Sequence, residues 1–511
     1  MADGATLTLD LEKFRLRPFV KRLVEIGEVE LYEAPISLAR LSSVIEASPK
    51  ATLFKNVGVE GYEMVAAVSG SRKRLAAAFG VEPREVAHEF MRRVSDPQKI
   101  VEVPSAQAPV HEVVKTGEDI DLTRLPFHVQ HELDGSAYIS AGIDYSVDPK
   151  TGRTNVGCRR LMLRGRRHMR SNLTDNSDLK RCYLGCVERG EKLPVSFAIG
   201  SHPLDYLAAT AKIPVDEFGL LGTLRGEPVP MVRGRTNGVL APADAEMIIE
   251  GYFDELGYRE LEGPYGEFYG FYGPVHIDPV FHVTAICTRK DVLHQTVLHS
   301  GRYLSRTDSA NLGSLHAEVA CWRALRGARI EPAAIHNVPA SNGRQHVRVA
   351  LRRGQPGQAR AAIMALFAVM GTKHIFIVDD DIDVFDDQQV EWAMSARFRA
   401  DRDLVVQGGL PGFYADPLVG EDKTIAKAGF DLTMKTDEPN RIDNLRPKAA
   451  AFTGPARYQT VRQALEAGPI YFAAIVEGVG SSDGREVALE LEDMQAHGVV
   501  TRTKDGAWTL K

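Results

Sequence analysis

The sequence predicts a protein of mixed α/β type, in the α+β arrangement, with more than one domain. Short strand-like runs between Gly- and Pro-rich turns fill residues 120–310, and strand-like and helix-like segments alternate from about residue 330. The chain has 511 residues, which corresponds to roughly three domains of ~150 residues each. Hydrophobic residues make up 44% and charged residues 25% of the chain. This balance is typical of globular proteins and excludes a disordered, collagen-like or coiled-coil chain.

The N-terminal segment is predicted to be rich in helix. Residues 101–113 contain two prolines and show no helical period, which indicates a domain boundary near them. The predicted helices are an opening one with apolar residues Phe19, Leu23 and Ile26 at steps of three and four, a second at Arg72–Phe79 that stops at Gly80, and a third at 85–95.

The central region is predicted to form a barrel or a sandwich rather than a doubly wound sheet. Its strand-like runs are short and rich in β-branched and aromatic residues. One helix, Ala243–Phe253, is expected to interrupt them ahead of Gly257. The predicted strands are Tyr138–Tyr145, Leu161–Leu163, Val195–Ile199, Pro279–Ile286 and Val292–Leu298.

The C-terminal part is predicted to be an α/β layer domain followed by a helical tail. A strand, a helix, a second strand and a second helix follow one another, as in layered α/β folds. These segments are His346–Leu351, Gln358–Met370, His374–Val378 and Gln388–Arg399, and the tail helices are Tyr458–Glu466 and a second near 485–496.

Charge and cysteine content favour a cytoplasmic protein that does not coat nucleic acid. The net charge of −6 is a poor match for a nucleic-acid-binding surface. The longest apolar run, Ala361–Met370, is shorter than the roughly 20 residues that span a bilayer. The first residues lack the features of a secretory signal. Five cysteines with no CxxC pair indicate reduced thiols.

A pair of glutamates is the most informative chemical feature. Glu262 and Glu267 enclose a Gly-Pro-Tyr-Gly turn, and an aromatic-rich run follows them. A turn can bring two carboxylates to one point, as paired acid and base chemistry requires. An exposed loop with two surface glutamates is the alternative, although so many aromatic residues usually pack.

Further candidates surround this pair in the sequence. The segment Asn155–Arg160 leads into a strand with two arginines, which suits an anionic ligand or simply an exposed hairpin. Glu217 stands at a helix start, and Asp379–Asp383 could bind Mg²⁺ or be a solvated loop. No Walker loop, Rossmann fingerprint or HExxH motif occurs. Hydride transfer on a Rossmann fold and zinc hydrolysis are therefore disfavoured.

Taken in order, these motifs resemble the UbiD-type decarboxylases, which use prenylated FMN and a divalent metal. The resemblance extends from about residue 12 to 440. It implies an N-terminal α/β domain at 1–115, a split β-barrel flavin-binding domain at 116–325, a C-terminal α/β oligomerisation domain at 326–455 and a helical tail at 456–511. The matching elements are Asn155–Arg160, Pro194–Ser196, Glu217 with Leu224–Gly226, Ala245–Tyr252, Glu262–Glu267, Gly301-Arg302, Lys373, the aspartate loop and Lys427–Thr433.

The resemblance also assigns roles to residues. Arg160 matches the catalytic arginine, Glu262 the glutamate that pairs with it, and Glu267 the acid that protonates the product. Asn155 and Glu217 match two ligands of Mn²⁺ or Mg²⁺, with K⁺ as a further candidate cation. Asp178 is expected where the family has a histidine ligand, with Asp175 as the alternative if the register shifts. The cofactor contacts are expected from Asn155, Val156, Gly157, Cys158, Arg159, Arg160, Ser177, Asp178, Glu217 and Lys373.

The implied function is reversible, non-oxidative decarboxylation of an aromatic, heteroaromatic or α,β-unsaturated carboxylic acid. His299 and Arg302 are candidate substrate contacts, and His299 favours a small heteroaromatic acid such as pyrrole-, furan-, indole- or phenazine-carboxylate. The expected partners are the acid, CO₂, a flavin prenyltransferase that supplies the cofactor, and a second copy of the chain in a homodimer or larger assembly. The alternatives are a split-barrel flavin oxidoreductase and a non-enzymatic flavin carrier.

Overall fold

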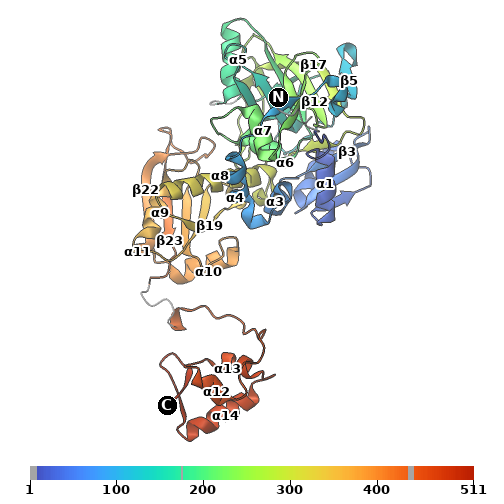
Figure 1. The fold of residues 1–511 in the computed structure, drawn as a ribbon. Coiled ribbons are helices and arrows are strands. Elements are labelled where there is room, and N and C mark those ends of the chain that lie inside the picture. Colours follow the sequence, from blue (N-terminus) through green and yellow to red (C-terminus); the bar gives the residue numbers. More distant parts are fainter. Residues whose placement is uncertain (1–8, 174–176, 436–441) are drawn as a thin grey trace, which may run out of the picture. The chain divides into compact units, whose positions relative to one another are not determined.

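A computed structural model describes residues 9–173, 177–435 and 442–511. The chain divides into two compact units, Met1–Thr433 and Met434–Lys511. The first unit holds a small N-terminal sheet, a β-barrel and a C-terminal sheet (Figure 1). The mixed α/β class predicted from the sequence is confirmed.

The N-terminal layer is a four-stranded sheet covered by helices. Its strand order is β1-β2-β3-β18, and β18 comes from a segment more than 200 residues later in the chain. The three helices expected from the sequence correspond to α1, α3 and α4, whereas α2 was not predicted. The elements are α1 (Leu16–Glu25), β1 (Val29–Tyr32), α2 (Leu38–Ala47), β2 (Ala51–Val57), β3 (Tyr62–Ala66), α3 (Arg72–Phe79), α4 (Val86–Val94) and β18 (His294–Thr296).

The centre of the first unit is a closed six-stranded barrel. The strands run in the order β12-β9-β6-β7-β8-β17, and β12 pairs with β17 to close the ring. A seventh strand, β5, is added to β17. The elements are β5 (Val113–Thr116), β6 (Tyr138–Val147), β7 (Thr154–Leu163), β8 (His168–Ser171), β9 (Leu193–Ile199), β12 (Met247–Phe253) and β17 (Val280–Thr288).

The expectation of a helix at Ala243–Phe253 is wrong, because most of this segment is strand β12. Nearly all of its residues are buried, since the strand lies between β9 and β17. A strand buried on both faces shows a continuous apolar run without the alternation that identifies strands. The segment therefore could not be distinguished from a buried helix by its pattern.

Helices and short hairpins surround the barrel. Glu262 ends β13, Glu267 follows β14, and the chain returns through small hairpins. The elements are β4 (Ile100–Glu102), α5 (Asp178–Glu188), α6 (Pro203–Thr210), α7 (Glu217–Arg225), β10 (Val229–Arg233), β11 (Leu240–Pro242), β13 (Glu260–Glu262), β14 (Tyr265–Gly266), β15 (Tyr272–Gly273) and β16 (His276–Asp278).

A long helix, α8, leads from the barrel into the C-terminal sheet. It packs against α4 and α6 on one side and against β19 and α9 on the other (Figure 1). The sheet has the order β19-β20-β21-β23-β22, with parallel pairing of β20, β21 and β23. The elements are α8 (Asp308–Gly327), β19 (Pro332–Asn337), β20 (His346–Leu351), α9 (Gln358–Phe367), β21 (His374–Asp379), α10 (Asp387–Arg397), α11 (Ala400–Asp403), β22 (Leu404–Pro411) and β23 (Thr424–Asp431).

The described part of the second unit holds three α-helices and a β-hairpin. Ile470, between the first two helices, forms a bridge with Trp508 in the hairpin. The expected helical tail thus omitted both α13 and the hairpin. The elements are α12 (Val461–Glu466), α13 (Phe472–Val479), α14 (Arg485–Ala496), β24 (Val500–Arg502) and β25 (Trp508–Leu510).

We expect Trp508→Ala to unfold the second unit and leave the first intact. Trp508 is 6% exposed and packs in a small apolar core of its own with Val461, Ile475 and Leu491. Loss of a buried aromatic side chain costs about 3–5 kcal/mol, which is a large part of the stability of so small a unit. Hydrogen exchange would report the change, and a parallel loss of protection in the barrel strands would contradict it.

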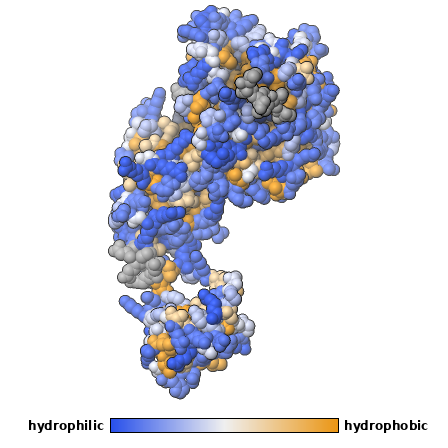
Figure 2. Space-filling model, viewed as in Figure 1, coloured by the Kyte–Doolittle hydropathy of each residue, from blue (hydrophilic) through white to orange (hydrophobic). Residues whose placement is uncertain are grey.

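The surface of the molecule is mainly polar on the face drawn in Figure 2, with hydrophobic residues scattered over it. Among the helices of the described residues, none combines the length and apolar character that a membrane span requires.

Candidate functional site

Arg160 joins both predicted glutamates through one guanidinium group. It lies in β7, while Glu262 ends β13 and Glu267 follows β14. Its Nε and Nη2 donate to the two oxygens of Glu262, each at 2.8 Å, and Nη1 donates to Glu267 at 2.5 Å. Glu262 is fully buried and the Arg160 side chain is 10% exposed. A bidentate pair held this way fixes the plane of the guanidinium.

An aromatic ring supports this arginine from one side. The Tyr265 ring centroid lies 4.6 Å from the Arg160 guanidinium carbon, a cation–π contact. Tyr265 is fully buried, packs against Tyr138, and donates its hydroxyl to Gln130. The loop also packs tightly, because a Cβ at Gly266 would lie 2.5 Å from the His131 ring. The turn therefore requires glycine there.

Glu267 is held in its ionised form. Burial alone would raise its pKa, but the neighbouring His299 and the Arg160 charge outweigh burial and lower the pKa to about 2. His299 Nε2 lies 3.7 Å from a Glu267 oxygen, and Nδ1 lies 2.6 Å from the Ser309 hydroxyl. Glu267 is therefore ionised at neutral pH in this arrangement, and it can donate a proton only after its surroundings change.

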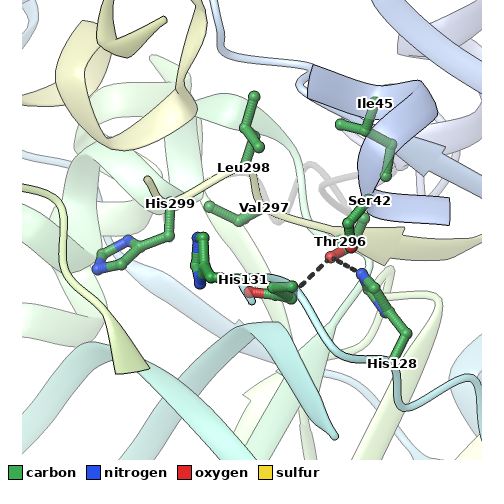
Figure 3. A pocket seen from close by; sticks show the side chains of 9 residues that line it. Ser42, Ile45, His128, His131, Thr296, Val297, Leu298 and His299 are labelled. Carbon is green, nitrogen blue, oxygen red and sulfur yellow. Dashed lines mark hydrogen bonds between the residues drawn. The ribbon is translucent and has the colours of Figure 1, made fainter. Parts of the chain in front are cut away.

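A small pocket lies beside this group. His299 borders it, and His131 contacts the Tyr265 ring from the same region. Figure 3 shows the His131 and His299 rings near Val297, with His128 hydrogen-bonded to Thr296 on the other side. The lining residues are Ser42, Ile45, His128, Gln130, His131, Thr296, Val297, Leu298 and His299.

Asn155 and Glu217 offer oxygen donors at the opposite end of β7. The Asn155 amide nitrogen donates to Asp144, which leaves its amide oxygen available. Glu217, at the start of α7, accepts from the Val156 backbone at 2.6 Å through one oxygen. Burial, together with the charge of Asp144, raises the pKa of Glu217. A hard divalent cation would fit these donors and offset the clustered negative charge.

Asp178 lies at the start of α5 and forms ion pairs with arginine side chains. It pairs with Arg181 and lies 3.7 Å from Arg153, whose position is two residues before Asn155. Ser177 caps this helix by accepting from the Lys180 backbone. The alternative ligand, Asp175, is outside the described residues.

The residues between Asn155 and Arg160 are packed closely against Asp144. Arg159 Nε lies 3.1 Å from an Asp144 oxygen. Burial raises the pKa of Asp144 to about 6, although Arg159 opposes this. A Cβ at Gly157 would lie 2.9 Å from Asp144. Burial also raises the pKa of the Cys158 thiol to about 12, so this thiol is unreactive at neutral pH.

Two residues of the predicted site, Lys373 and Arg302, form their described ion pairs away from the Arg160 group. Lys373 pairs with Asp416 at 2.8 Å, and Asp416 also accepts from Gln345, which contacts Tyr269 in the glutamate loop. Lys373 is thus linked to that loop only through intermediates. The Arg302 side chain is 81% exposed and lies 3.4 Å from Glu46. The described contacts do not join it to the Arg160 group.

Sequence reasoning missed several residues that shape the site. Tyr265 supports Arg160, and Asp144 orients Asn155 and Arg159. Tyr265 lies within the motif Glu262–Glu267, and its position between two glutamates is a signal that could have identified it. Asp144 lies in a strand whose apolar neighbours gave no separate signal for it.

Family comparison covers most of the first unit. The chain matches the N-terminal domain of 3-octaprenyl-4-hydroxybenzoate carboxy-lyase over residues 29–94, its Rift-related domain over 101–302 and its C-terminal domain over 310–432. A relative from Methanosarcina mazei, described as anhydromevalonate phosphate decarboxylase, is 32% identical over 433 residues. The match covers 84% of this chain and 98% of that relative.

Solved structures show the same architecture. The UbiD-class enzyme HmfF from Pelotomaculum thermopropionicum, in complex with FMN, is 29% identical with a TM-score of 0.78, over 85% of this chain and 97% of that one. An evolved dimeric form of HmfF in complex with prenylated FMN is 27% identical with a TM-score of 0.76, over 86% of this chain and 97% of that one. The domain matches, the identity to the Methanosarcina relative and the shared fold show that the chain belongs to the UbiD family and is a carboxy-lyase.

Proposed function

We propose that this enzyme uses prenylated FMN and a divalent metal to decarboxylate a small unsaturated or aromatic carboxylic acid, reversibly and without oxidation. The observation that carries the proposal is the Arg160 guanidinium bound to Glu262 and Glu267 at once. This arrangement offers one cation for a carboxylate and one carboxyl group for a proton. The flavin bound to the two HmfF structures supports the choice of cofactor.

The cofactor would supply an electron sink for the pair released when the carbon–carbon bond breaks. Asn155 and Glu217, with Asp178, would hold the metal that binds the flavin phosphate, and Mn²⁺ or Mg²⁺ suits such oxygen donors. Lys373 is the proposed phosphate contact. The Asn155–Arg160 segment would lie along the flavin.

The protein residues would divide the remaining work. Arg160 would bind the substrate carboxylate and orient it, while Glu262 holds the guanidinium in its plane. A bound carboxylate brings a negative charge next to Glu267, and a like charge raises the pKa of a carboxyl group. Glu267 would then take up a proton on substrate binding and deliver it to the carbon that loses CO₂. His299, which contacts Glu267, is placed to relay that proton.

The substrate is proposed to carry a second polar group that reaches the histidine-lined pocket. His131 and His299 lie on one side of it. A small heteroaromatic acid and an acyclic phosphorylated acid both fit this description, and the name of the Methanosarcina relative supports the second. Assays of CO₂ release from furan-, pyrrole- and indole-carboxylate and from anhydromevalonate phosphate, after co-production with a flavin prenyltransferase, would test the proposal. No CO₂ release from any acid by the flavin-loaded enzyme would contradict it.

Metal removal is expected to remove the flavin. If the metal bridges the protein and the flavin phosphate, exhaustive chelation should release the flavin, and Mn²⁺ should restore binding. Asp178→Ala should lose metal and flavin together, while Asp175→Ala should keep both. Arg181→Ala is the matched control, because it removes the ion pair of Asp178 but keeps the carboxylate. Flavin absorbance and metal analysis measure the result, and full flavin occupancy after chelation would exclude the bridge.

We propose a homodimer or larger assembly in the cytoplasm. An evolved dimeric form of HmfF supports this proposal, and light scattering on the purified chain would test it.

A further inference from the structure

A second group of ligand-type side chains lies on the barrel wall. His111 is in the short 3₁₀ helix Pro109–His111, Glu250 is in β12 and Cys287 is in β17. The ligand atoms of these three residues all lie within 4.8 Å of one another. The Cys287 sulfur lies 3.5 Å and His111 Nε2 lies 4.0 Å from the same oxygen of Glu250, Oε1. None of these residues belongs to the proposed catalytic or cofactor-binding set.

The three side chains are shielded from solvent. Glu250 and Cys287 are 0% exposed, and the His111 side chain is 2% exposed. Their elements are neighbours in the barrel: β12 pairs with β17, and β5, which follows His111, pairs with β17 beside Cys287. Because Glu250 faces Ala285, two residues from Cys287 along the strand, both side chains are on one face of the sheet.

Among the described residues, this buried carboxylate forms no ion pair with a lysine or arginine, and the nearby Arg235 guanidinium donates to Ser105 instead. Other fully buried glutamates have an arginine, as Glu246 has Arg15 and Glu318 has Arg72. Within the described residues, no lysine or arginine side chain lies within 4.0 Å of the Glu250 oxygens. The backbone N–H of Arg235 donates to Oε1, and the backbone and hydroxyl of Thr236 donate to Oε2. A carboxylate has about four lone-pair positions, so Oε1 keeps one toward Cys287 and His111.

His111 presents an unpartnered nitrogen to this oxygen. Its Nε2 is buried and has no hydrogen-bond partner among the described residues. Its other nitrogen, Nδ1, lies 2.9 Å from the Ser105 hydroxyl. If Nδ1–H donates to Ser105, the lone pair of Nε2 points into the cluster. Metal-binding histidines are commonly oriented in this way by a hydrogen bond at the second ring nitrogen.

We propose that His111, Glu250 and Cys287 bind a Zn²⁺ ion. Imidazole, carboxylate and thiolate are the usual ligands of zinc, at about 2.0–2.3 Å. In a tetrahedral site, ligand atoms at those distances are about 3.3–3.7 Å apart. The Cys287–Glu250 separation of 3.5 Å lies in this range, whereas His111 Nε2, 4.0 Å from Glu250 Oε1, would move closer on binding. Zn²⁺ would neutralise the carboxylate and the thiolate, and it would tie the segment before β5 to the barrel. Binding would release the thiol proton to solvent.

The sulfur ligand makes the site distinguishable from the flavin-associated metal. Only oxygen donors are proposed for that metal, so Co²⁺ bound there should give no sulfur-to-cobalt charge-transfer band. The metal-stripped full-length chain, titrated with Co²⁺ without oxygen, is expected to develop such a band in the near ultraviolet. The band should saturate at one equivalent per chain and disappear when Zn²⁺ is added. The absence of this band from the saturated wild-type chain would overturn the proposal.

Variants assign the band to these residues. Cys287→Ser should abolish the band, and His111→Ala should weaken Co²⁺ binding at least ~10-fold, as loss of metal-site partners typically does. Cys186→Ser is the matched control, because Cys186 is also buried but lies on α5, outside the cluster. Retention of the band in Cys287→Ser, or its loss in Cys186→Ser, would contradict the assignment. The wild-type titration decides the question even if a variant fails to fold.

Discussion

Glu267→Gln is expected to lower turnover by about 10²–10⁴, the usual range for loss of a general acid. Glutamine is nearly isosteric and can still accept a hydrogen bond from Arg160, so folding and flavin binding should persist. It has no carboxylic proton to deliver to the carbon that loses CO₂. Steady-state CO₂ release measures the effect, and exchange of the product's hydrogen with D₂O should fall in parallel because it uses the same acid.

The control for this change is the flavin spectrum, which should match that of the wild-type enzyme. A Glu267→Gln enzyme that kept most of its decarboxylation and exchange rates would show that Glu262 or a water molecule carries the proton.

The same variant should also change the stability of the fold in acid. The pKa of Glu267 is lowered to about 2 in the folded chain, below the ordinary value of about 4.3. Its ionised form therefore stabilises the fold above pH ~4.3, and this contribution is lost as the pH falls toward 2. Glutamine should remove that part of the acid sensitivity.

Arg160→Lys is expected to lower turnover by about 10²–10³, the range for loss of one oriented electrostatic contact. Lysine keeps the positive charge but cannot donate two parallel hydrogen bonds to Glu262. The substrate carboxylate would then be bound by a mobile point charge, and both its affinity and its orientation should suffer. The measurement is kcat/KM together with kcat, since loss of orientation lowers kcat as well as affinity.

Arg160→Ala distinguishes the contribution of Arg160 to stability from its contribution to turnover. It leaves Glu262 buried without a cation, which costs about 3–5 kcal/mol of stability. Thermal unfolding should therefore distinguish it from Arg160→Lys, which keeps the charge. If Arg160→Lys retained wild-type kcat/KM, the bidentate geometry would have no part in catalysis, and the proposed role of Arg160 would be wrong.

Local patterns were sufficient for segments with a clear period. The strand His346–Leu351 is β20 with the same bounds, and Arg72–Phe79 is α3, which ends at Gly80. Both segments combine apolar spacing with a clear end signal. The pattern failed where tertiary contacts outweighed it. Met247–Phe253 is a strand because β9 and β17 flank it, and nothing local shows those neighbours.

The candidate site was predicted in part. Arg160, Glu262 and Glu267 were predicted to act together, and the structure places them in direct contact. Arg302 was predicted to contact the substrate and Lys373 the cofactor, and their described ion pairs are with Glu46 and Asp416. Both roles stay predictions. The proposed Zn²⁺ cluster left no local signal, since His111, Glu250 and Cys287 are separated by 139 and 37 positions and form no spacing motif.

By itself, the sequence determined the mixed α/β class, those helices and strands that have a clear local pattern, and the order of motifs that indicates a decarboxylase. These features depend on local apolar spacing and on short runs of residues. Only the tertiary structure decided that the barrel closes through β12 and β17, that β18 joins the N-terminal sheet, and that Arg160 meets a glutamate 102 positions away. The physical reason is that strand pairing and buried ion pairs depend on which distant segments exclude water together, and the spacing of residues along the chain does not record those contacts.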